Sequence, residues 1–134
     1  MASSSVDRSG RSPLHYCALD GTATRAAELL AAGEDPGRTD REGSTPLHFA
    51  AQRGNVEVGR LLLEHGAEVD APNEFGNSAL WIAVINSRGN GDFITLLLNA
   101  GANPRRENTT GSSPLSLARK IANYDVAQFF ADVE

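Results

Sequence analysis

Histidine and cysteine commonly bind metals or act as nucleophiles, and the residues of these types in this sequence are His15, Cys17, His48 and His65. His15 and His48 lie 33 residues apart, whereas a metal-binding helix places two histidines four residues apart and needs a third ligand. His65, just before a helix-ending glycine, has a structural interpretation. No histidine–aspartate pairing marks Cys17 as a nucleophile, so a buried small thiol is the simpler interpretation. The glycines of stretch 88–92 follow no predicted strand and do not resemble a phosphate-binding loop. We therefore expect no metal, no cofactor and no enzymatic activity.

Composition and charge exclude further classes of function and of binding partner. The chain has 134 residues, 40% of them hydrophobic, a mean hydropathy of −0.30, and a formal net charge of −5. This acidic balance disfavours nucleic acid as the main partner, because such binders carry a basic excess. A single cysteine forms no intrachain disulfide, and no segment has the apolar length of a signal peptide or a membrane span. We expect a soluble, cytoplasmic protein that is monomeric by itself.

The elements that must position these residues recur along the chain. An Asp or Asn followed three residues later by Gly appears at 7–10, 40–43, 73–76 and 108–111, at intervals of 33, 33 and 35 residues. Such pairs favour tight turns, because the side chain bonds nearby backbone and Gly accepts a positive φ. After each turn comes a Ser or Thr that would cap a helix, usually followed by Pro. A second helix rich in leucine should follow and end at Gly33, Gly66 or Gly101.

Helix pairs this short cannot bury their own apolar faces, so neighbouring units must stack. At this point the sequence resembles the ankyrin-repeat family, whose unit of about 33 residues carries the phrase T-P-L-H-x-A. Residues 45–50 match that phrase without a change. The resemblance covers 7–134 in four units, at about 7–39, 40–72, 73–107 and 108–134. It implies an all-α ankyrin-repeat solenoid of helix-turn-helix pairs linked by β-hairpin loops, forming one domain over 1–134, and structural roles for His15 and His48.

Two departures from the repeat are informative. Arg25 and Glu28 replace the apolar Val58 and Leu61 of the second unit, which suits a solvent-facing cap, and polar residues around Phe129 suggest a second cap. We therefore expect a complete four-unit module. The third unit carries Trp81 in place of histidine, and two extra residues in the turn 86–92. This insertion is either a tolerated loop variation or a partner-specific contact around Trp81 and Arg88.

The resemblance implies a protein partner, bound on the concave side by hairpin tips and the exposed face of the first helices. Phe75 is a large ring at a tip, explained either by partner contact or by packing on the adjacent hairpin. The tip and helix positions hold five basic residues against three acidic ones, so the expected partner has an acidic or mixed-charge patch. The predicted contact residues are Arg8, Arg11, Tyr16, Arg41, Glu42, Phe49, Gln52, Arg53, Glu74, Phe75, Asn77, Trp81, Ile82, Asn86 and Arg88.

The sequence leaves the kind of binding module open. A small free-standing module could be an inhibitor or immunity protein that blocks one enzyme or toxin, or an adaptor that connects several proteins. A binder of nucleic acid or of anionic surfaces is the weaker alternative, given the acidic balance.

Overall fold

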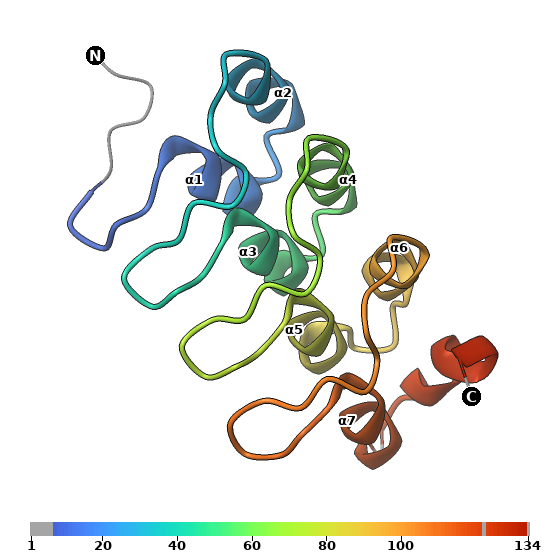
Figure 1. Ribbon diagram of the computed structural model, residues 1–134. Helices are drawn as coiled ribbons and strands as arrows, with labels where there is room; N and C mark the ends of the chain where they lie inside the picture. Colours follow the sequence, from blue (N-terminus) through green and yellow to red (C-terminus); the bar gives the residue numbers. More distant parts are fainter. Residues whose placement is uncertain (1–6, 122, 134) are drawn as a thin grey trace.

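Helices stack in two rows in the computed structural model, which describes residues 7–121 and 123–133 (Figure 1). The first helices of successive units, α1, α3, α5 and α7, form an inner row, and α2, α4 and α6 form an outer row. Long loops project from the inner row on the side away from the outer helices. The helices span Pro13–Asp20, Ala23–Ala31, Pro46–Arg53, Val56–Glu64, Ala79–Asn86, Asp92–Asn99 and Pro114–Lys120 for α1 to α7, and the 3-10 helix η1 spans Val126–Val133.

The repeat arises from local signals. Ser12, Thr45, Ser78 and Ser113 each cap the first helix of a unit by accepting a hydrogen bond from a backbone N–H three residues on. Three of the four helices then begin with proline, which tolerates this position because the first N–H needs no partner. α1 and α3 end at glycines with φ of 77° and 71°, a left-handed conformation that reverses the chain into the second helix.

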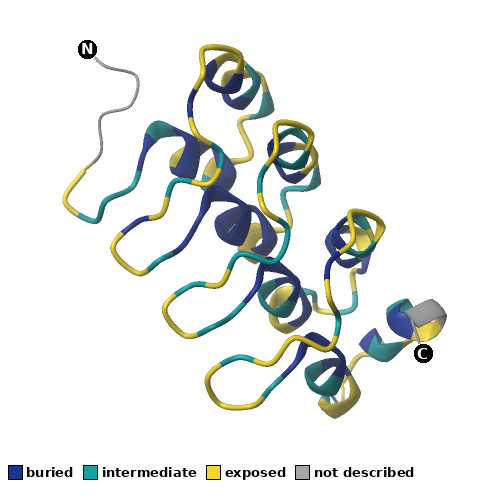
Figure 2. Cartoon of the chain, viewed as in Figure 1, coloured by how far each residue is buried: buried dark blue, intermediate teal, exposed yellow. Residues whose placement is uncertain are grey.

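Two columns of apolar side chains join the units. Leu14, Leu47, Leu80 and Leu115 occupy equivalent positions on the inner helices, and each is at most 4% exposed. The second column comprises Leu29, Leu62, Leu97 and Phe130, each at most 5% exposed. Burying one such side chain contributes roughly 1.5–3 kcal/mol, so the stack is stabilised mainly between units. Figure 2 shows this buried interior between the two rows.

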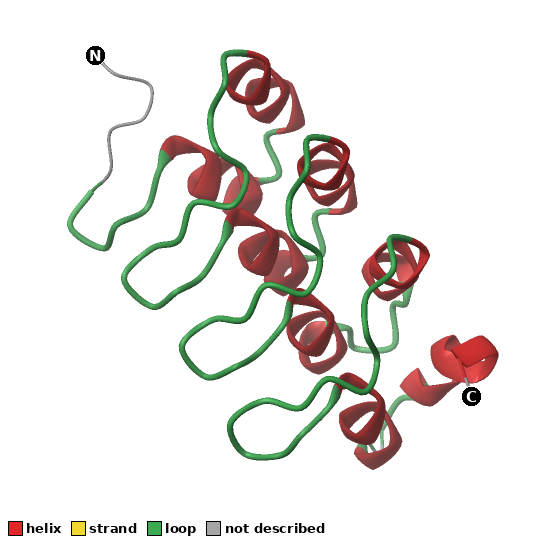
Figure 3. Cartoon of the chain, in the orientation of Figure 1, coloured by secondary structure: helices red, strands yellow, loops and turns green. Residues whose placement is uncertain are grey.

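The expected solenoid is confirmed, with two differences in detail. The linking loops are closed by hairpin-like hydrogen bonds, but none of the described residues forms a strand (Figure 3). The second helix of the fourth unit is a 3-10 helix and not an α-helix, although Phe130 fills the core position that Leu97 occupies in the third unit. The turn before it also differs: α7 is followed by Ile121 with extended backbone, whereas α1 and α3 are followed by a left-handed glycine.

Candidate functional site

The hairpin tips are built by one repeated hydrogen-bond pattern. In each tip, one side-chain oxygen of the first residue accepts the backbone N–H groups of the residues two and four positions on, at 2.9–3.1 Å. The residues that accept these bonds are Asp7, Asp40, Asn73 and Asn108. The short polar side chain thus supplies a hydrogen-bond acceptor to N–H groups that would otherwise have none within the turn. The turns predicted from the Asp/Asn-x-x-Gly spacing are confirmed at all four positions.

Successive tips are also bonded to one another. The Arg41 N–H donates to the carbonyl of Ser9 at 2.9 Å, and the Glu74 N–H donates to the carbonyl of Glu42 at 2.9 Å. The Thr109 N–H continues the series to the carbonyl of Phe75 at 3.0 Å. The tips therefore form one connected row along the molecule, and Figure 3 shows their loops arranged side by side.

Most of the predicted tip residues extend from this row into solvent. Arg8, Arg41, Glu42 and Glu74 are exposed, and the Phe75 side chain is 57% exposed. Packing on the adjacent hairpin therefore leaves more than half of this ring in water. An exposed aromatic ring on an ordered turn is the kind of side chain that dominates binding energies.

Asn77 lies differently, at the base of its tip. Its carbonyl accepts a hydrogen bond from the His48 ring at 2.9 Å, and its Oδ1 accepts one from the Asn108 amide at 2.8 Å. Both contacts join neighbouring units. The structure thus places Asn77 between units rather than at the outer edge of the row.

The first helices continue the surface inward from the tips. Gln52, Arg53 and Asn86 are exposed, Tyr16 is 38% exposed, and Ile82 is half-buried. The C-terminal ends of α3 and α5 flank a shallow pocket of about 190 Å³, lined by Gln52, Arg53, Asn86, Ser87 and Asn90 among others. The pocket brings together three residues that the sequence assigned to the binding surface. Ile85, 51% exposed on α5, adds an apolar side chain that was not among the predicted contacts.

Phe49 was predicted to contact a partner, but its ring is only 7% exposed. The guanidinium of Arg11 covers it, with 4.8 Å between the guanidinium carbon and the ring centre, and the ring meets His15 edge-on at 5.6 Å. Arg11 also pairs with Asp40, with 3.6 Å from Nε to Oδ2. Periodicity placed Phe49 on the correct helix face, but the long side chain from the preceding unit was not foreseen.

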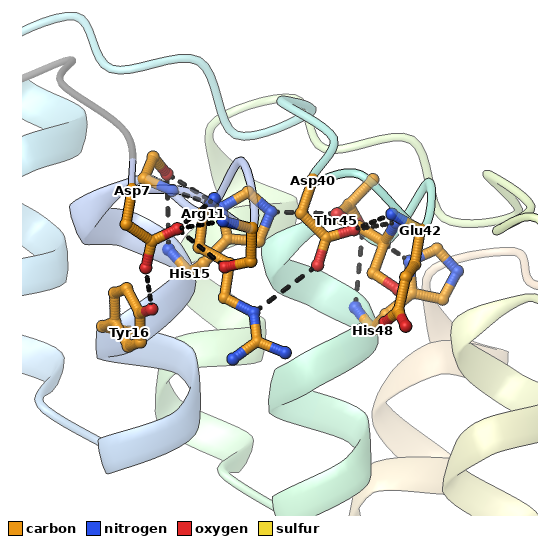
Figure 4. A network of polar contacts seen from close by, with 11 residues as sticks. Asp7, Arg11, His15, Tyr16, Asp40, Glu42, Thr45 and His48 are labelled. Carbon is orange, nitrogen blue, oxygen red and sulfur yellow. Dashed lines mark hydrogen bonds and ion pairs between the residues drawn. The ribbon is translucent and has the colours of Figure 1, made fainter.

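Asp7 and Tyr16 form a second polar contact in this region. The Tyr16 hydroxyl donates to Oδ2 of Asp7, and this hydrogen bond, together with one from Ser9, lowers the pKa of the exposed Asp7 carboxyl (Figure 4). The contact orients the Tyr16 ring at the edge of the surface formed by the first two units.

His15 and His48 have the structural role that the resemblance implied. In each, Nδ1 accepts the N–H of the capping residue, Ser12 or Thr45, at 3.0 and 2.9 Å. The proton is therefore on Nε2, which donates to the carbonyls of Ser44 and Asn77 in the next units at 2.9 Å. Burial lowers the pKa of both rings below the ordinary 6.5.

Trp81 makes the same kind of connection one unit further along. Its ring nitrogen donates to Oγ of Ser112 at 3.0 Å, and Ser112 occupies in the fourth tip the position of Ser44 and Asn77. The half-buried indole thus replaces the missing histidine. Position 81 within the repeat was the available signal, because both preceding units carry a histidine there.

The inserted loop of the third unit supports the C-terminal segment. A tight turn closes between Ser87 and Asn90 at 2.9 Å and holds the exposed Arg88 at a φ of 51°. A Cβ added at Gly89 would lie 2.9 Å from the Tyr124 ring, and one at Gly91 would overlap the Phe129 ring. Neither of the two interpretations of this insertion anticipated that its glycines are packing sites for aromatic rings.

The remaining candidates from the sequence are the Cys17 thiol, a metal site and a membrane-spanning helix. Burial raises the pKa of the Cys17 thiol, which lies in the core. Among residues 7–121 and 123–133, no three His, Cys, Asp or Glu side chains are grouped so as to hold a metal ion. Within the same part of the chain, no helix is both long and apolar enough to span a membrane.

Comparison with known families agrees with this geometry. The model of ankyrin repeats in three copies matches residues 14–108, which is more than half of the chain and runs from α1 to the fourth tip. A search of curated proteins gave no match. Ankyrin repeats are generally non-catalytic modules for protein–protein interaction. The sequence phrase, the stacked helix pairs and the family match lead to one assignment: the chain belongs to the ankyrin-repeat family.

Proposed function

We propose that this protein is a non-catalytic binding module that recognises another protein through its row of hairpin tips and the exposed ends of its first helices. The observation that carries the proposal is the connected row of tips, which is bonded from unit to unit and still presents Phe75 at 57% exposure. A row ordered before binding loses little conformational entropy when a partner docks, so its side-chain contacts contribute more fully to affinity.

The proposed contact surface, called here the tip surface, combines apolar and charged groups. Phe75, Ile85 and Tyr16 supply exposed apolar area, and arginines at the first two tips supply charge-assisted hydrogen bonds. The tip surface consists of Arg8, Arg11, Tyr16, Arg41, Glu42, Gln52, Arg53, Glu74, Phe75, Ile82, Ile85, Asn86 and Arg88. We assign Phe49, Asn77 and Trp81 supporting roles, since each contacts a neighbouring unit.

The partner proposed for this surface is a protein with an acidic or mixed-charge patch. Such a module would act by occupying a surface, either blocking an active site, as an inhibitor or immunity protein does, or joining proteins, as an adaptor does. We expect it to act in the cytoplasm as a monomer and not to bind nucleic acid, because the chain is acidic overall.

Capture of partners from the native cell by tagged variants tests the proposal. Phe75→Ser and Arg41→Glu alter the tip surface, whereas Arg25→Glu reverses an exposed charge on the outer helix α2 as a matched control. We expect the control to retain the proteins captured by the original chain, and both tip variants to lose them by at least about tenfold. Equal capture by all three folded variants would overturn the proposal. A single stoichiometric partner favours an inhibitor, and several weak partners favour an adaptor.

A further inference from the structure

Arg11 is held in a defined position on the tip surface. Its side chain is 30% exposed, and Nε lies 3.6 Å from Oδ2 of Asp40. The guanidinium carbon lies 4.8 Å from the ring centre of Phe49 and 6.0 Å from that of Tyr16. An ionic contact and two aromatic rings therefore fix a side chain that would otherwise have large rotational freedom.

The groups that hold Arg11 are themselves ordered. The Asp40 side chain is 2% exposed, and its other oxygen accepts the N–H groups of Glu42 and Ser44 at 2.9 Å. The Phe49 ring is 7% exposed and rests edge-on against His15. Little ordering remains to be done when a ligand arrives, which is the condition under which one charged contact contributes most to affinity.

Arg11 has N–H donors that remain available to a ligand. A guanidinium has five N–H donors. In the described part of the chain, the Nε of Arg11 has no hydrogen-bond partner and is at ion-pair distance, 3.6 Å, from Asp40. Figure 4 shows its two terminal nitrogens turned away from Asp40 and from the tip. This free edge has the planar fork geometry that binds the two oxygens of a carboxylate.

We propose that Arg11 is the receptor for one carboxylate of an acidic segment of the partner protein, bound by its two terminal nitrogens. This inference rests on the proposed function and specifies its partner chemistry. Because the proposed partner is a protein, the side-chain carboxylate of an acidic residue is the group that this fork would meet, and the nearby carboxylates of Asp7 and Asp40 already contact Tyr16 and Arg11 (Figure 4).

The test uses the full ¹⁵N-labelled chain and two synthetic peptides, N-acetyl tetraglutamate amide and its tetraglutamine counterpart. Nuclear magnetic resonance follows the Nε–H signal of Arg11, which is assigned by its absence in Arg11→Lys. The acidic peptide should shift this signal saturably and leave the Arg25 signal in place. Affinity should fall by at least about tenfold in both Arg11→Gln and Arg11→Lys, because lysine keeps the charge but loses the fork. Arg25→Gln, the matched control, should bind within about twofold of the original chain.

Three outcomes of the peptide titration overturn the inference. The Arg11 signal does not shift, Arg11→Gln binds the peptide as tightly as the original chain, or Arg25→Gln loses as much affinity as Arg11→Gln. The last result would indicate diffuse charge attraction. Equal binding of tetraglutamine or of inorganic phosphate would also exclude an acidic peptide segment as the specific ligand. If Phe75→Ser abolishes partner capture while Arg11→Gln preserves it, the carboxylate site is wrong and the proposed function stands. If Arg11 binds the peptide but the tip variants retain every partner, the proposed function fails instead.

Discussion

Position 81 shows how one residue contributes a hydrogen bond between two neighbouring units. The ring N–H groups of His15 and His48 donate hydrogen bonds to backbone carbonyls of the next unit. The indole N–H of Trp81 donates instead to the hydroxyl of Ser112. The acceptor changes from an obligatory backbone group to a side chain, so the bond to the fourth unit depends on Ser112. A substitution at either residue should therefore weaken the same connection.

Trp81→Phe removes the indole donor and should lower the free energy of unfolding by about 1–2 kcal/mol, including lost packing. Ser112→Ala removes the acceptor and should cost somewhat less, about 1 kcal/mol. Denaturant unfolding of both single variants and of the double variant measures the coupling between them. The double variant should be clearly less destabilised than the sum of the singles. Strict additivity would mean that the Trp81–Ser112 hydrogen bond does not stabilise the protein.

The buried histidines also predict how stability depends on pH. Burial lowers the pKa of both rings below 6.5 in the folded chain, so the unfolded chain takes up protons first as the pH falls. The histidine contribution is therefore complete above about pH 6.5 and is lost below it, by at most about 1.4 kcal/mol per pH unit for each ring. Unfolding measured from pH 7.5 to 5.5 should show this decline.

His48→Gln separates the histidine effect from other titrations. Glutamine at this position can still accept the N–H of Thr45, as in the common capping box, but it does not titrate. The variant should be less stable at pH 7.5 and should show about half the decline between pH 6.5 and 5.5, because only His15 remains. An unchanged decline would show that the buried histidines do not cause it.

At the scale of elements, the inserted loop and the C-terminal segment depend on each other. Gly91 has a φ of −92°, so a larger residue would suffer no backbone strain there, yet its Cβ would overlap the Phe129 ring. The loop therefore positions the segment that supplies Phe130 to the core of the fourth unit. The glycines of this loop therefore have a packing role, whereas the sequence suggested only loop variation or contact with a partner.

Gly91→Ala should accordingly destabilise the protein by roughly 1–3 kcal/mol through overpacking. Gly37→Ala is the matched control, because the nearest atom to its added Cβ is an Asp35 side-chain oxygen at 3.5 Å and its φ is outside the left-handed region. Thermal unfolding should show a lower midpoint for the first variant and little change for the second. Equal midpoints would contradict the proposed packing of Phe129 on the loop.

The two-helix unit was predictable because its determinants are local. Proline after a capping serine or threonine, the turn-forming Asp or Asn, and the 33-residue spacing each act within a few residues. The 3-10 form of η1 was not predictable in this way. Its segment packs through Phe129 on Gly91 of the inserted loop, a contact between distant parts of the chain that no local signal indicates.

The tip surface was predictable to the level of positions but not of side-chain contacts. Sequence spacing identified the tips and the exposed ends of the first helices, and Arg8, Arg41 and Phe75 are exposed there. It missed that Arg11 covers Phe49, because that contact runs between units and depends on the rotamer of a long side chain. Pairings of this kind follow from the stack as a whole.

On the scale of the whole molecule, the units form a continuous scaffold with two different surfaces. One is the tip surface, ordered by hydrogen bonds between successive tips, and the other is the exposed side of the outer helices. Three exposed aromatic residues report on separate regions: Tyr16 and Phe75 belong to the tip surface, whereas Tyr124 lies beside the inserted loop near the C-terminal helix. Their exposed fractions are 38%, 57% and 44%, so each is accessible to chemical labelling.

Hydroxyl-radical footprinting of the chain with and without its captured partner therefore tests the central claim most directly. We predict that Tyr16 and Phe75 become protected in the complex, while the oxidation of Tyr124 is unchanged. Protection of Tyr124, with Tyr16 and Phe75 labelled as in the free chain, would place the partner elsewhere and contradict the assignment of the tip surface.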